Sequence, residues 1–383
     1  MPGDGIAVLH GNYFQRGGGE VVADTLAKVF DAPLYYGFGC DDVMPDDGVD
    51  RRQIFDPGTI QRWVAHNNSH ARDALFMWCG QHLPELHEYD TIIISGNEFG
   101  WYVPRDYQTV VKYIHSPPRG AYDMFHRNGE SRAHRAYSLA VKTLYRHTIT
   151  TPARTVANSE LVARRCRMYW GIKPDIVYPP IDVSEYGPEN ATTDHDQPTY
   201  LTFSRLYRHK RTREIVQAFA DLPDAKLIVG GDGPQRETLE EIAGENVEIR
   251  GYLEEAEKRR LLAEVDALIF NARNEDFGIV PIEAFASGTP VLGIRDGYTA
   301  HQITDGWNGV LFDDGTPRQI AEAVRVSQQM DFALPEELVA FAEQFGVNEF
   351  SRRMHRVVAE ARENEAVTGV AELATAERVE ADD

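Results

Sequence analysis

The chain has 383 residues and a formal net charge of −21, from 60 acidic and 39 basic residues. This length exceeds what one hydrophobic core usually holds, so two domains of ordinary size are expected. No apolar run reaches the roughly 20 residues that span a bilayer, and the first residues lack the basic and apolar regions of a secretory signal. We therefore expect a cytoplasmic protein that neither crosses a membrane nor is exported.

The cysteine and lysine contents of the chain indicate which chemistry and which environment to expect. The three cysteines, Cys40, Cys79 and Cys166, are widely scattered, so buried thiols are expected in place of a disulfide or metal framework. Lysine is scarce, at 7 Lys against 32 Arg. An acidic, lysine-poor surface suits a protein that functions in high salt, so a halophilic source is one hypothesis and an acidic mesophile is the other.

The chain opens with a predicted strand, a glycine-rich loop and a helix. Residues 6–10 are apolar, residues 11–19 end in three consecutive glycines, and residues 20–30 are apolar at helical spacing. Because glycine lets the backbone approach an anion closely, this loop can bind a phosphate at Gly17 and Gly18; a flexible turn is the alternative. The spacing is not that of a nicotinamide-binding loop.

Three more strands are predicted in this half, at 32–38, 91–95 and 110–114, with a mostly helical stretch over 59–83. Asn97 and Glu98 follow the strand at 91–95. Their position at a strand's carboxyl end suggests a contact with an acceptor molecule, with a simple cap as the alternative.

The segment from Val111 to Trp170 reverses the charge of the chain, with eleven basic and three acidic residues. Aromatic residues alternate with the cations. This pattern suits an anionic lipid surface or a polyprenyl-phosphate head group, and equally suits helices paired with acidic neighbours elsewhere. Nucleic acid is disfavoured because the whole chain is acidic.

A stretch rich in Pro, Asp and other turn formers, residues 181–198, predicts a linker. The strand predicted at 200–203 follows it, and Arg205 and Lys210 lie just beyond that strand's end. Two cations at this spacing suit a diphosphate, because arginine binds in bidentate fashion and lysine acts as a point charge. Strands at 226–229 and 247–250 continue an alternating strand and helix pattern.

Residues 266–294 carry the most informative pattern. The apolar run 267–270 predicts a buried strand, a polar loop follows at 271–276, and a helix is predicted from about Phe277 to Ser287 before the next strand, 289–294. The loop and helix start offer free backbone N–H groups to an anion. Glu275 and Glu283 flank this site, and carboxylates beside a phosphate have hydroxyls as natural partners, so a nucleotide sugar is indicated. The alternative is an ordinary strand–helix unit with solvated carboxylates.

The stretch EDFGIVPIEAFASGTPV, with seven residues between Glu275 and Glu283, resembles the signature of the retaining, nucleotide-sugar-dependent glycosyltransferases of group 1 (family 4). YIHSPPRGAYD, which contains His115, resembles a mannosyltransferase-like branch of that family. The resemblance implies an α/β protein of the GT-B fold, with two Rossmann-like doubly wound domains and a cleft between them. The domains implied are 1–180 on the acceptor side and 199–347 for the nucleotide sugar, followed by a helix over 348–363 that packs back on the first domain and a disordered acidic tail over 364–383.

The resemblance also implies a role for each matching residue. Glu275 lies against the transferred sugar, Glu283 holds the ribose hydroxyls, and His115 contacts the donor sugar or the acceptor. The remaining matches bind the donor. Gly17 and Gly18 contact the distal phosphate, and Arg205 and Lys210 bind the diphosphate. Main-chain atoms near Leu253 contact the base, and sugar and phosphate contact the backbone of Phe277, Gly278, Ile279 and Val280. The family usually has glycine where this chain has Ser204 and Arg211.

The expected reaction is transfer of a hexose to an acceptor hydroxyl with retention, without a metal or another cofactor. Mannose from GDP-mannose is the first choice, and the acceptor is a glycan, a polysaccharide or a lipid-linked oligosaccharide, with peripheral contact at the cytoplasmic face of a membrane. Same-face attack is favoured over a covalent intermediate. The alternatives are a nucleotide-sugar epimerase on the same fold and a non-catalytic partner that binds nucleotide sugar. The Asp-Asp pairs at 41–42, 46–47 and 313–314 are rejected as a metal site.

Overall fold

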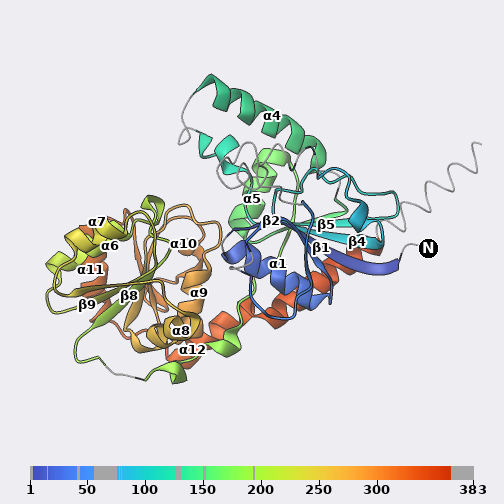
Figure 1. Cartoon of the computed structure of the whole chain (residues 1–383). Helices are drawn as coiled ribbons and strands as arrows, with labels where there is room; N and C mark the ends of the chain where they lie inside the picture. The colour runs from blue at the N-terminus through green and yellow to red at the C-terminus, as the bar shows by residue number, and fades with distance from the viewer. Residues whose placement is uncertain are drawn as a thin grey trace, which may run out of the picture. The chain divides into compact units, whose positions relative to one another are not determined.

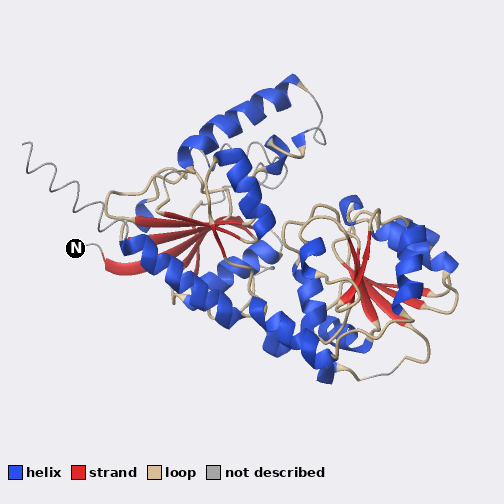
Figure 2. Ribbon diagram, turned by 180° about the vertical axis from the view of Figure 1, so that it is seen from behind, coloured by secondary structure: helices blue, strands red, loops and turns tan. Residues whose placement is uncertain are grey.

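The structure is a computed structural model, and it describes residues 3–14, 16–40, 44–55, 76, 78, 80–125, 131–149, 152–192 and 195–363. Internal contacts divide the chain into two units (Figures 1 and 2). The first unit contains the described residues up to Pro180 and those from Phe350 onward, and the second is Ile181–Glu349. The predicted stretch 59–83 lies largely outside the described residues, as does the tail 364–383.

The first unit is built on a seven-stranded sheet in the order β3-β2-β1-β4-β5-β6-β7, and every neighbouring pair is parallel. Strands β2 and β5 are buried along their whole length, as expected when helices cover both faces of a parallel sheet. The strands are β1 (Gly3–Tyr13), β2 (Leu34–Gly39), β3 (Arg51–Gln53), β4 (Tyr89–Ser95), β5 (Thr109–Ile114), β6 (Arg154–Ala157) and β7 (Asp175–Ile176).

Helices pack on both faces of this sheet. On one face α1 (Gly18–Val29) shares a buried cluster with a helix over residues 347–363, so that Leu26 and Val22 pack in the same core as Phe350 and Met354. Elsewhere in the unit, α5 (Glu160–Trp170) is capped by Ser159, whose hydroxyl accepts from the Val162 N–H at 3.2 Å. Another of the described helices, α4 (Arg132–Thr148), stands out from the sheet in Figures 1 and 2.

The second unit has a six-stranded parallel sheet in the order β10-β9-β8-β11-β12-β13. Counted from its own first strand this order is 3-2-1-4-5-6, the order of a Rossmann-like domain. The strands are β8 (Thr199–Phe203), β9 (Lys226–Gly230), β10 (Val247–Gly251), β11 (Ala267–Phe270), β12 (Val291–Ile294) and β13 (Gly309–Phe312). The helices are α6 (Thr212–Ala218), α7 (Arg236–Ile242), α8 (Glu255–Glu264), α9 (Ile279–Ala286), α10 (Thr299–Gln302), α11 (Pro317–Ser327) and α12 (Pro335–Ala342).

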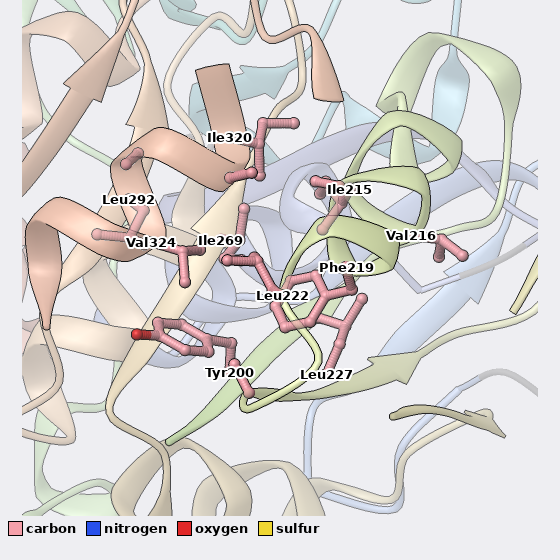
Figure 3. Close-up of a cluster of buried hydrophobic side chains, with 14 of the residues drawn as sticks. Tyr200, Ile215, Val216, Phe219, Leu222, Leu227, Ile269, Leu292, Ile320 and Val324 are labelled. Carbon is pink, nitrogen blue, oxygen red and sulfur yellow. The ribbon is translucent and has the colours of Figure 1, made fainter. Parts of the chain in front are cut away.

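One face of this second sheet is covered by α6 and α11. Figure 3 shows Ile215 of α6, Phe219 directly after it, and Ile320 and Val324 of α11, gathered over the strand residues in a buried cluster. Burying a side chain of this size contributes about 1.5–3 kcal/mol. The cluster fixes the strands against their helices, so the loops at the carboxyl ends of the strands start from defined positions.

The α/β class with two Rossmann-like units is confirmed, and most predicted strands are present within one to three residues. Two strands were missed. β3 has the sequence RRQ and β7 has only two residues, so neither has the apolar run that predicts a buried strand. Residues 181–192, predicted as linker, pack on the second unit: Ile181 donates its N–H to the Phe345 carbonyl at 2.9 Å, and Tyr186 is buried. Among the described residues, none of the helices is both long and apolar enough to cross a membrane.

Candidate functional site

The loop between β11 and α9 is held in place by the loop that follows β12. Asn274, in the left-handed region at φ 59°, donates its N–H to the Asp296 carboxylate at 2.5 Å, and the Tyr298 N–H donates to the Glu275 carbonyl at 2.9 Å. Gly297 lies so close that a Cβ there would stand 2.5 Å from the Glu275 nitrogen. Only glycine permits this approach, and its φ of 62° is one that other residues rarely adopt. The backbone of Glu275 is therefore fixed on both sides.

Helix α9 begins at Ile279, two residues later than predicted, and ends at Ala286, with the predicted stop residue Gly288 in the left-handed region two residues beyond. At its end the Thr289 N–H bonds to the Ala284 carbonyl and the Gly288 N–H to the Phe285 carbonyl, which is a Schellman motif. At its start Gly278 is the N-cap, and none of the described residues provides a side-chain cap there. The N–H groups of Ile279 and Val280 are thus not taken by a capping side chain.

Glu275 forms an ion pair with Lys210, with 2.9 Å between the Glu275 Oε2 and the Lys210 Nζ. Lys210 lies in a short 3-10 turn, Arg208–Lys210, after β8, so the pair joins the ends of two adjacent strands. Both side chains are partly exposed, at 17% for Lys210 and 27% for Glu275. A ligand there would meet a cation and a carboxylate side by side. Arg205 is exposed, with its guanidinium over the Tyr207 ring.

Arg211 explains one of the two departures from the family pattern. Its φ of 58° is left-handed, which is the conformation that glycine adopts without cost. The arginine side chain then reaches the loop after β13 and donates to the Asp314 carbonyl at 3.0 Å and the Gly315 carbonyl at 2.9 Å. The Asn271 amide also donates to Gly315, at 3.1 Å. Arg211 therefore ties the β8 loop to the β13 loop.

Glu283 lies in the second turn of α9 and is buried. Its Oε1 accepts two hydrogen bonds, from the Tyr186 hydroxyl at 2.8 Å and from the Lys258 Nζ at 2.9 Å. Burial alone would lower the pKa of Lys258, but the carboxylates of Glu283 and Glu255 outweigh it and raise that pKa. Leu253, the predicted base contact, is buried in the loop after β10, where its side chain lies over Gly230.

In the first unit, polar side chains meet at the carboxyl ends of three neighbouring strands. His115 follows β5 and shares a hydrogen bond of 2.8 Å between its Nε2 and the Ser95 hydroxyl at the end of β4. The His10 Nδ1, on β1, donates to the Ser95 carbonyl at 3.0 Å, and its Nε2 lies 3.9 Å from the Glu20 carboxylate of α1. His10 and Glu20 were not predicted as site residues.

The pKa values of the two histidines in this cluster are shifted in opposite directions. Burial alone would lower the pKa of His10, but the Glu20 and Glu98 carboxylates and the Ser95 carbonyl outweigh it and raise that pKa. Burial, with His10 beside it, lowers the pKa of His115 to about 3. His115 is therefore neutral at ordinary pH, and any positive charge in this pair lies on His10.

The glycines predicted to meet a phosphate lie at the start of α1. Gly17 is extended and is the N-cap, and Gly18 is the first helical residue. The Gly17 N–H already donates to the Glu20 carboxylate at 3.0 Å. The glycine turn is close to the histidines, because a Cβ on Gly19 would lie 3.7 Å from His10 and 3.9 Å from His115.

The predicted basic face over 111–170 is smaller than expected. Lys112 is buried, and burial lowers its pKa to about 8. Arg119 and Arg165 lie close to Asp123, and Arg154 pairs with Glu360 and Asp175. Arg127 and the side chain of Arg146 lie outside the described residues. The exposed cations are Arg132, Arg135 and Lys142 on α4 and Arg164 and Arg167 on α5, accompanied by the exposed Leu139 and Met168.

The acidic pairs rejected from the sequence have other partners where they are described. Asp47 pairs with Lys28 and Arg51, and Asp313 pairs with Arg295. Asp41 and Asp42 lie outside the described residues. Within the part of the chain that the structure describes, His, Cys, Asp and Glu side chains form no group that could hold a metal ion.

Part of the chain is similar in sequence to known glycosyltransferases. Residues 187–340 match the family model described as glycosyl transferases group 1. The chain is 30% identical over 137 residues to the lipopolysaccharide core biosynthesis glycosyltransferase LpsE of Rhizobium meliloti (strain 1021), covering 34% of this chain and 40% of that protein. It is 32% identical over 145 residues to the GDP-mannose-dependent alpha-(1-6)-phosphatidylinositol monomannoside mannosyltransferase of Mycolicibacterium smegmatis (strain ATCC 700084 / mc(2)155), covering 34% and 38%. The matches thus span less than half the length of each relative.

Two solved structures share the fold over nearly the whole chain. Anabaena Alr3699/HepE in complex with UDP and glucose superposes with a TM-score of 0.68 at 17% identity, covering 92% of this chain and 99% of that one. Sucrose-phosphate synthase (tll1590) from Thermosynechococcus elongatus superposes with a TM-score of 0.73 at 13% identity, covering 92% and 98%. The two Rossmann-like units thus have the GT-B fold. Residues 187–340 of the second unit are thus similar to the group 1 glycosyl transferases.

Arg211 yields a stability prediction. We expect Arg211→Gly to lower the free energy of unfolding, because the hydrogen bonds to Asp314 and Gly315 are lost. Arg211→Ala should lower it by about 1 kcal/mol more, because alanine keeps the cost of the left-handed backbone that glycine lacks. Denaturant unfolding followed by fluorescence measures both, with Arg213→Ala, an exposed neighbour on α6, as the control. An alanine variant at least as stable as the glycine variant would contradict the assigned strain.

His115 yields a pH prediction. Its pKa is about 3 in the folded protein against an ordinary value of 6.5, so below pH 6.5 the unfolded chain binds a proton that the folded protein does not. The free energy of unfolding therefore falls as the pH is lowered, by roughly 2 kcal/mol from this group by pH 5. The raised pKa of His10 acts oppositely, since its stabilisation is present at low pH and is lost as the pH rises through its folded value.

The measurement is unfolding of wild type and His115→Gln at pH 7 and pH 5. The variant should lose less stability than wild type on acidification, by about that amount. His355→Gln, which removes an exposed histidine from the same unit, is the control. Equal acid sensitivity of His115→Gln and wild type would show that His115 is not held neutral.

Proposed function

We propose that this protein is a retaining glycosyltransferase that moves a hexose from a nucleoside diphosphate sugar to an acceptor hydroxyl. The observation that carries the proposal is the Lys210–Glu275 pair at the start of α9, set on a backbone fixed by Gly297 and Asp296. A cation for a phosphate and a carboxylate for sugar hydroxyls stand together there, beside the N–H groups of a helix N-terminus. The family match covers this part of the chain.

The physical difficulty of the reaction is the negative charge that develops on the departing diphosphate. Lys210, Arg205 and the backbone N–H groups from Phe277 to Val280 are the groups of the second unit that would stabilise it. Preorganised donors of this kind are each worth on the order of 3 kcal/mol. No step in this scheme is assigned to a metal ion, and the residues named here supply the positive charge and the hydrogen bonds.

Glu275 would orient the hydroxyls of the transferred sugar. Its carboxylate oxygens can accept hydrogen bonds from sugar hydroxyls, and the ion pair with Lys210 holds the side chain in place. Retention then follows from attack on the same face as the departing phosphate, whose oxygen takes the proton of the acceptor hydroxyl. We favour this route over a covalent intermediate, because the Lys210 ion pair suits Glu275 to binding hydroxyls more than to attacking carbon.

In the first unit, we propose that His115 hydrogen-bonds a sugar hydroxyl of the donor or acceptor. A neutral imidazole can both donate and accept, which suits a hydroxyl, and the low pKa of His115 keeps it neutral. Gly17 and Gly18 remain our proposal for the distal phosphate. Glu20 would have to release the Gly17 N–H when a phosphate binds there.

The proposed donor is GDP-mannose. The resemblance of the His115 segment to the mannosyltransferase-like branch supports this choice, as does a relative named as a GDP-mannose-dependent mannosyltransferase. The Anabaena structures were solved with UDP and UDP-glucose, so a uridine donor is the alternative to test. We propose an acceptor in glycan, polysaccharide or lipid-linked oligosaccharide assembly.

An epimerase and a non-catalytic binding protein remain the competing functions. An epimerase would need acid and base groups on both faces of the sugar, and would convert the donor without any acceptor. A transferase releases nucleoside diphosphate at a rate that depends on acceptor. Following diphosphate release with and without glycan acceptors, and the donor's sugar by chromatography, separates the three.

The donor site can be tested by calorimetry with GDP-mannose, UDP-glucose and the corresponding free diphosphates, in low and molar KCl. We expect one nucleotide to bind, and Glu275→Gln to weaken binding of the intact sugar donor about tenfold without weakening binding of the free diphosphate, because the hydrogen bonds to the sugar are lost while Lys210 keeps its charge for the phosphates. The melting temperature should change little, since partly exposed ion pairs contribute about 0–1 kcal/mol.

Glu240→Gln is the matched control, because Glu240 also pairs with an arginine in the second unit but lies on α7 with its side chain 49% exposed. It should alter neither affinity. Equal weakening of donor and free diphosphate by Glu275→Gln, with a lower melting temperature, would refute the assignment of Glu275.

The same measurements in low and molar KCl test the halophilic hypothesis. A protein that is most stable without salt would contradict it.

We also propose that the exposed cations of α4 and α5 contact an anionic membrane surface where a lipid-linked acceptor resides. Arg132, Arg135 and Lys142 are exposed with Leu139 on α4, which therefore presents charge and apolar surface together. This cationic patch belongs to a chain with a net charge of −21, so its attraction for anionic lipid is local.

Vesicle sedimentation at low ionic strength tests this contact. Binding to vesicles with phosphatidylglycerol, and not to pure phosphatidylcholine, is expected. Replacing Arg132, Arg135 and Lys142 together by Gln should lower the partition coefficient about a hundredfold, because each cation near such a surface is worth about 1 kcal/mol. The control replaces three exposed arginines of the second unit, Arg213, Arg318 and Arg325, by Gln. Equal losses in the two triple variants would exclude a specific patch.

A further inference from the structure

The two oxygens of the Glu283 carboxylate have different surroundings. Oε1 accepts both of the side-chain hydrogen bonds that reach this residue, from Tyr186 at 2.8 Å and from Lys258 at 2.9 Å. Oε2 carries no hydrogen bond from any residue that the structure describes, and the side chain keeps 10% of its surface exposed. Oε2 is not among the buried polar atoms that lack a partner, so it is accessible to a ligand.

Three separate elements build this arrangement. Tyr186 comes from the segment that enters the second unit, Lys258 from α8 and Glu283 from α9. The Lys258 Nζ also pairs with Glu255 at 2.8 Å and lies over the rings of Tyr186 and Phe203 at about 6 Å. With both Tyr186 and Lys258 on one oxygen, rotation of the glutamate side chain is arrested and Oε2 is held in one direction.

The local charge determines what Oε2 can bind. One lysine faces two carboxylates, Glu283 and Glu255, so the group keeps a net negative charge. The nearby Arg259 is engaged with Glu185 and therefore does not neutralise it. A phosphate would be repelled, while a ligand with adjacent hydroxyl groups would donate to Oε2 in a charge-assisted hydrogen bond.

We propose that Tyr186 and Lys258 are positioning residues that fix Glu283 so that its Oε2 is presented to the vicinal hydroxyls of the donor's ribose. This inference rests on the proposed function, because it assumes that the second unit binds a nucleotide. It adds two residues on which recognition of the ribose depends, neither of which contacts the reacting bond. Tyr186 lies in a stretch that its composition had identified only as a linker.

The test is the preference for ribose, which general damage to the protein would not change. Dissociation constants of GDP and UDP and of their 2′,3′-dideoxy counterparts are measured by calorimetry for wild type and Tyr186→Phe. Wild type should bind the ribonucleotide about tenfold more tightly than its dideoxy form, because the dideoxy form cannot make the charge-assisted hydrogen bond to Glu283. Tyr186→Phe should reduce that ratio to about threefold or less, with the dideoxy constant unchanged.

Tyr200→Phe is the matched control. Tyr200 is also a buried tyrosine of the second unit, and its hydroxyl lies 3.2 Å from that of Ser327 in the core, on β8 and α11. This variant should leave the ratio at the wild-type value whatever it does to stability. Lys258→Met is the second variant, and it should bring the ratio close to one because it removes both the hydrogen bond from Lys258 to Oε1 and the cation beside the carboxylate.

The outcomes separate the inference from the function on which it rests. An unchanged ratio in both Tyr186→Phe and Lys258→Met, or equal weakening of ribose and dideoxy forms, overturns the positioning role and leaves nucleotide binding intact. Wild-type binding without any ribose preference also overturns it. Absence of binding by every nucleotide in wild type rejects the donor site itself, and the positioning role with it.

Discussion

The close approach of two backbones, at Gly297 and Glu275, is the constraint on which the second unit's site depends. Parallel strands end at one edge of a sheet, so the loops after β11 and β12 must share the same space. Because glycine has no side chain, the backbone at Gly297 can contact the backbone of Glu275. The Asn274 N–H donates to the Asp296 carboxylate and the Tyr298 N–H donates to the Glu275 carbonyl, and these hydrogen bonds hold the two loops together. The direction of Glu275, its reach to Lys210 and the start of α9 all follow from that contact.

The sequence was sufficient where chemistry and local structure lie in one continuous stretch. The strand 267–270, the polar loop and Glu275 could be read together because hydrophobic runs, Pro281 and Gly288 mark the elements without reference to the rest of the fold. The helix start was displaced by two residues, because Phe277 is apolar and buried yet packs on Tyr298 before the helix begins. Short strands such as β3 left no apolar signal at all.

What could not be predicted are the contacts that join distant parts of the chain. His10 is the last residue of an apolar run and looked like part of a strand, and only the order of β1, β4 and β5 brings it beside Ser95 and His115. Tyr186 was not predicted as a site residue, because it lies in a stretch of turn formers that was predicted to be a linker. Counting charges also overestimated the basic face, since a count cannot show that Lys112 is inside the protein and that Arg154 meets Glu360 across more than two hundred residues of sequence.

Arg211 has a left-handed backbone that glycine would adopt without cost, and its long side chain hydrogen-bonds the loop after β13. The two loops are therefore joined by this side chain. In a chimera between this chain and a relative with glycine at that position, moving residues 204–211 alone would leave the carbonyls of Asp314 and Gly315 without their donor. Moving residues 313–315 alone would leave a guanidinium without its acceptors. The two segments form one exchangeable module, although about a hundred residues separate them in sequence.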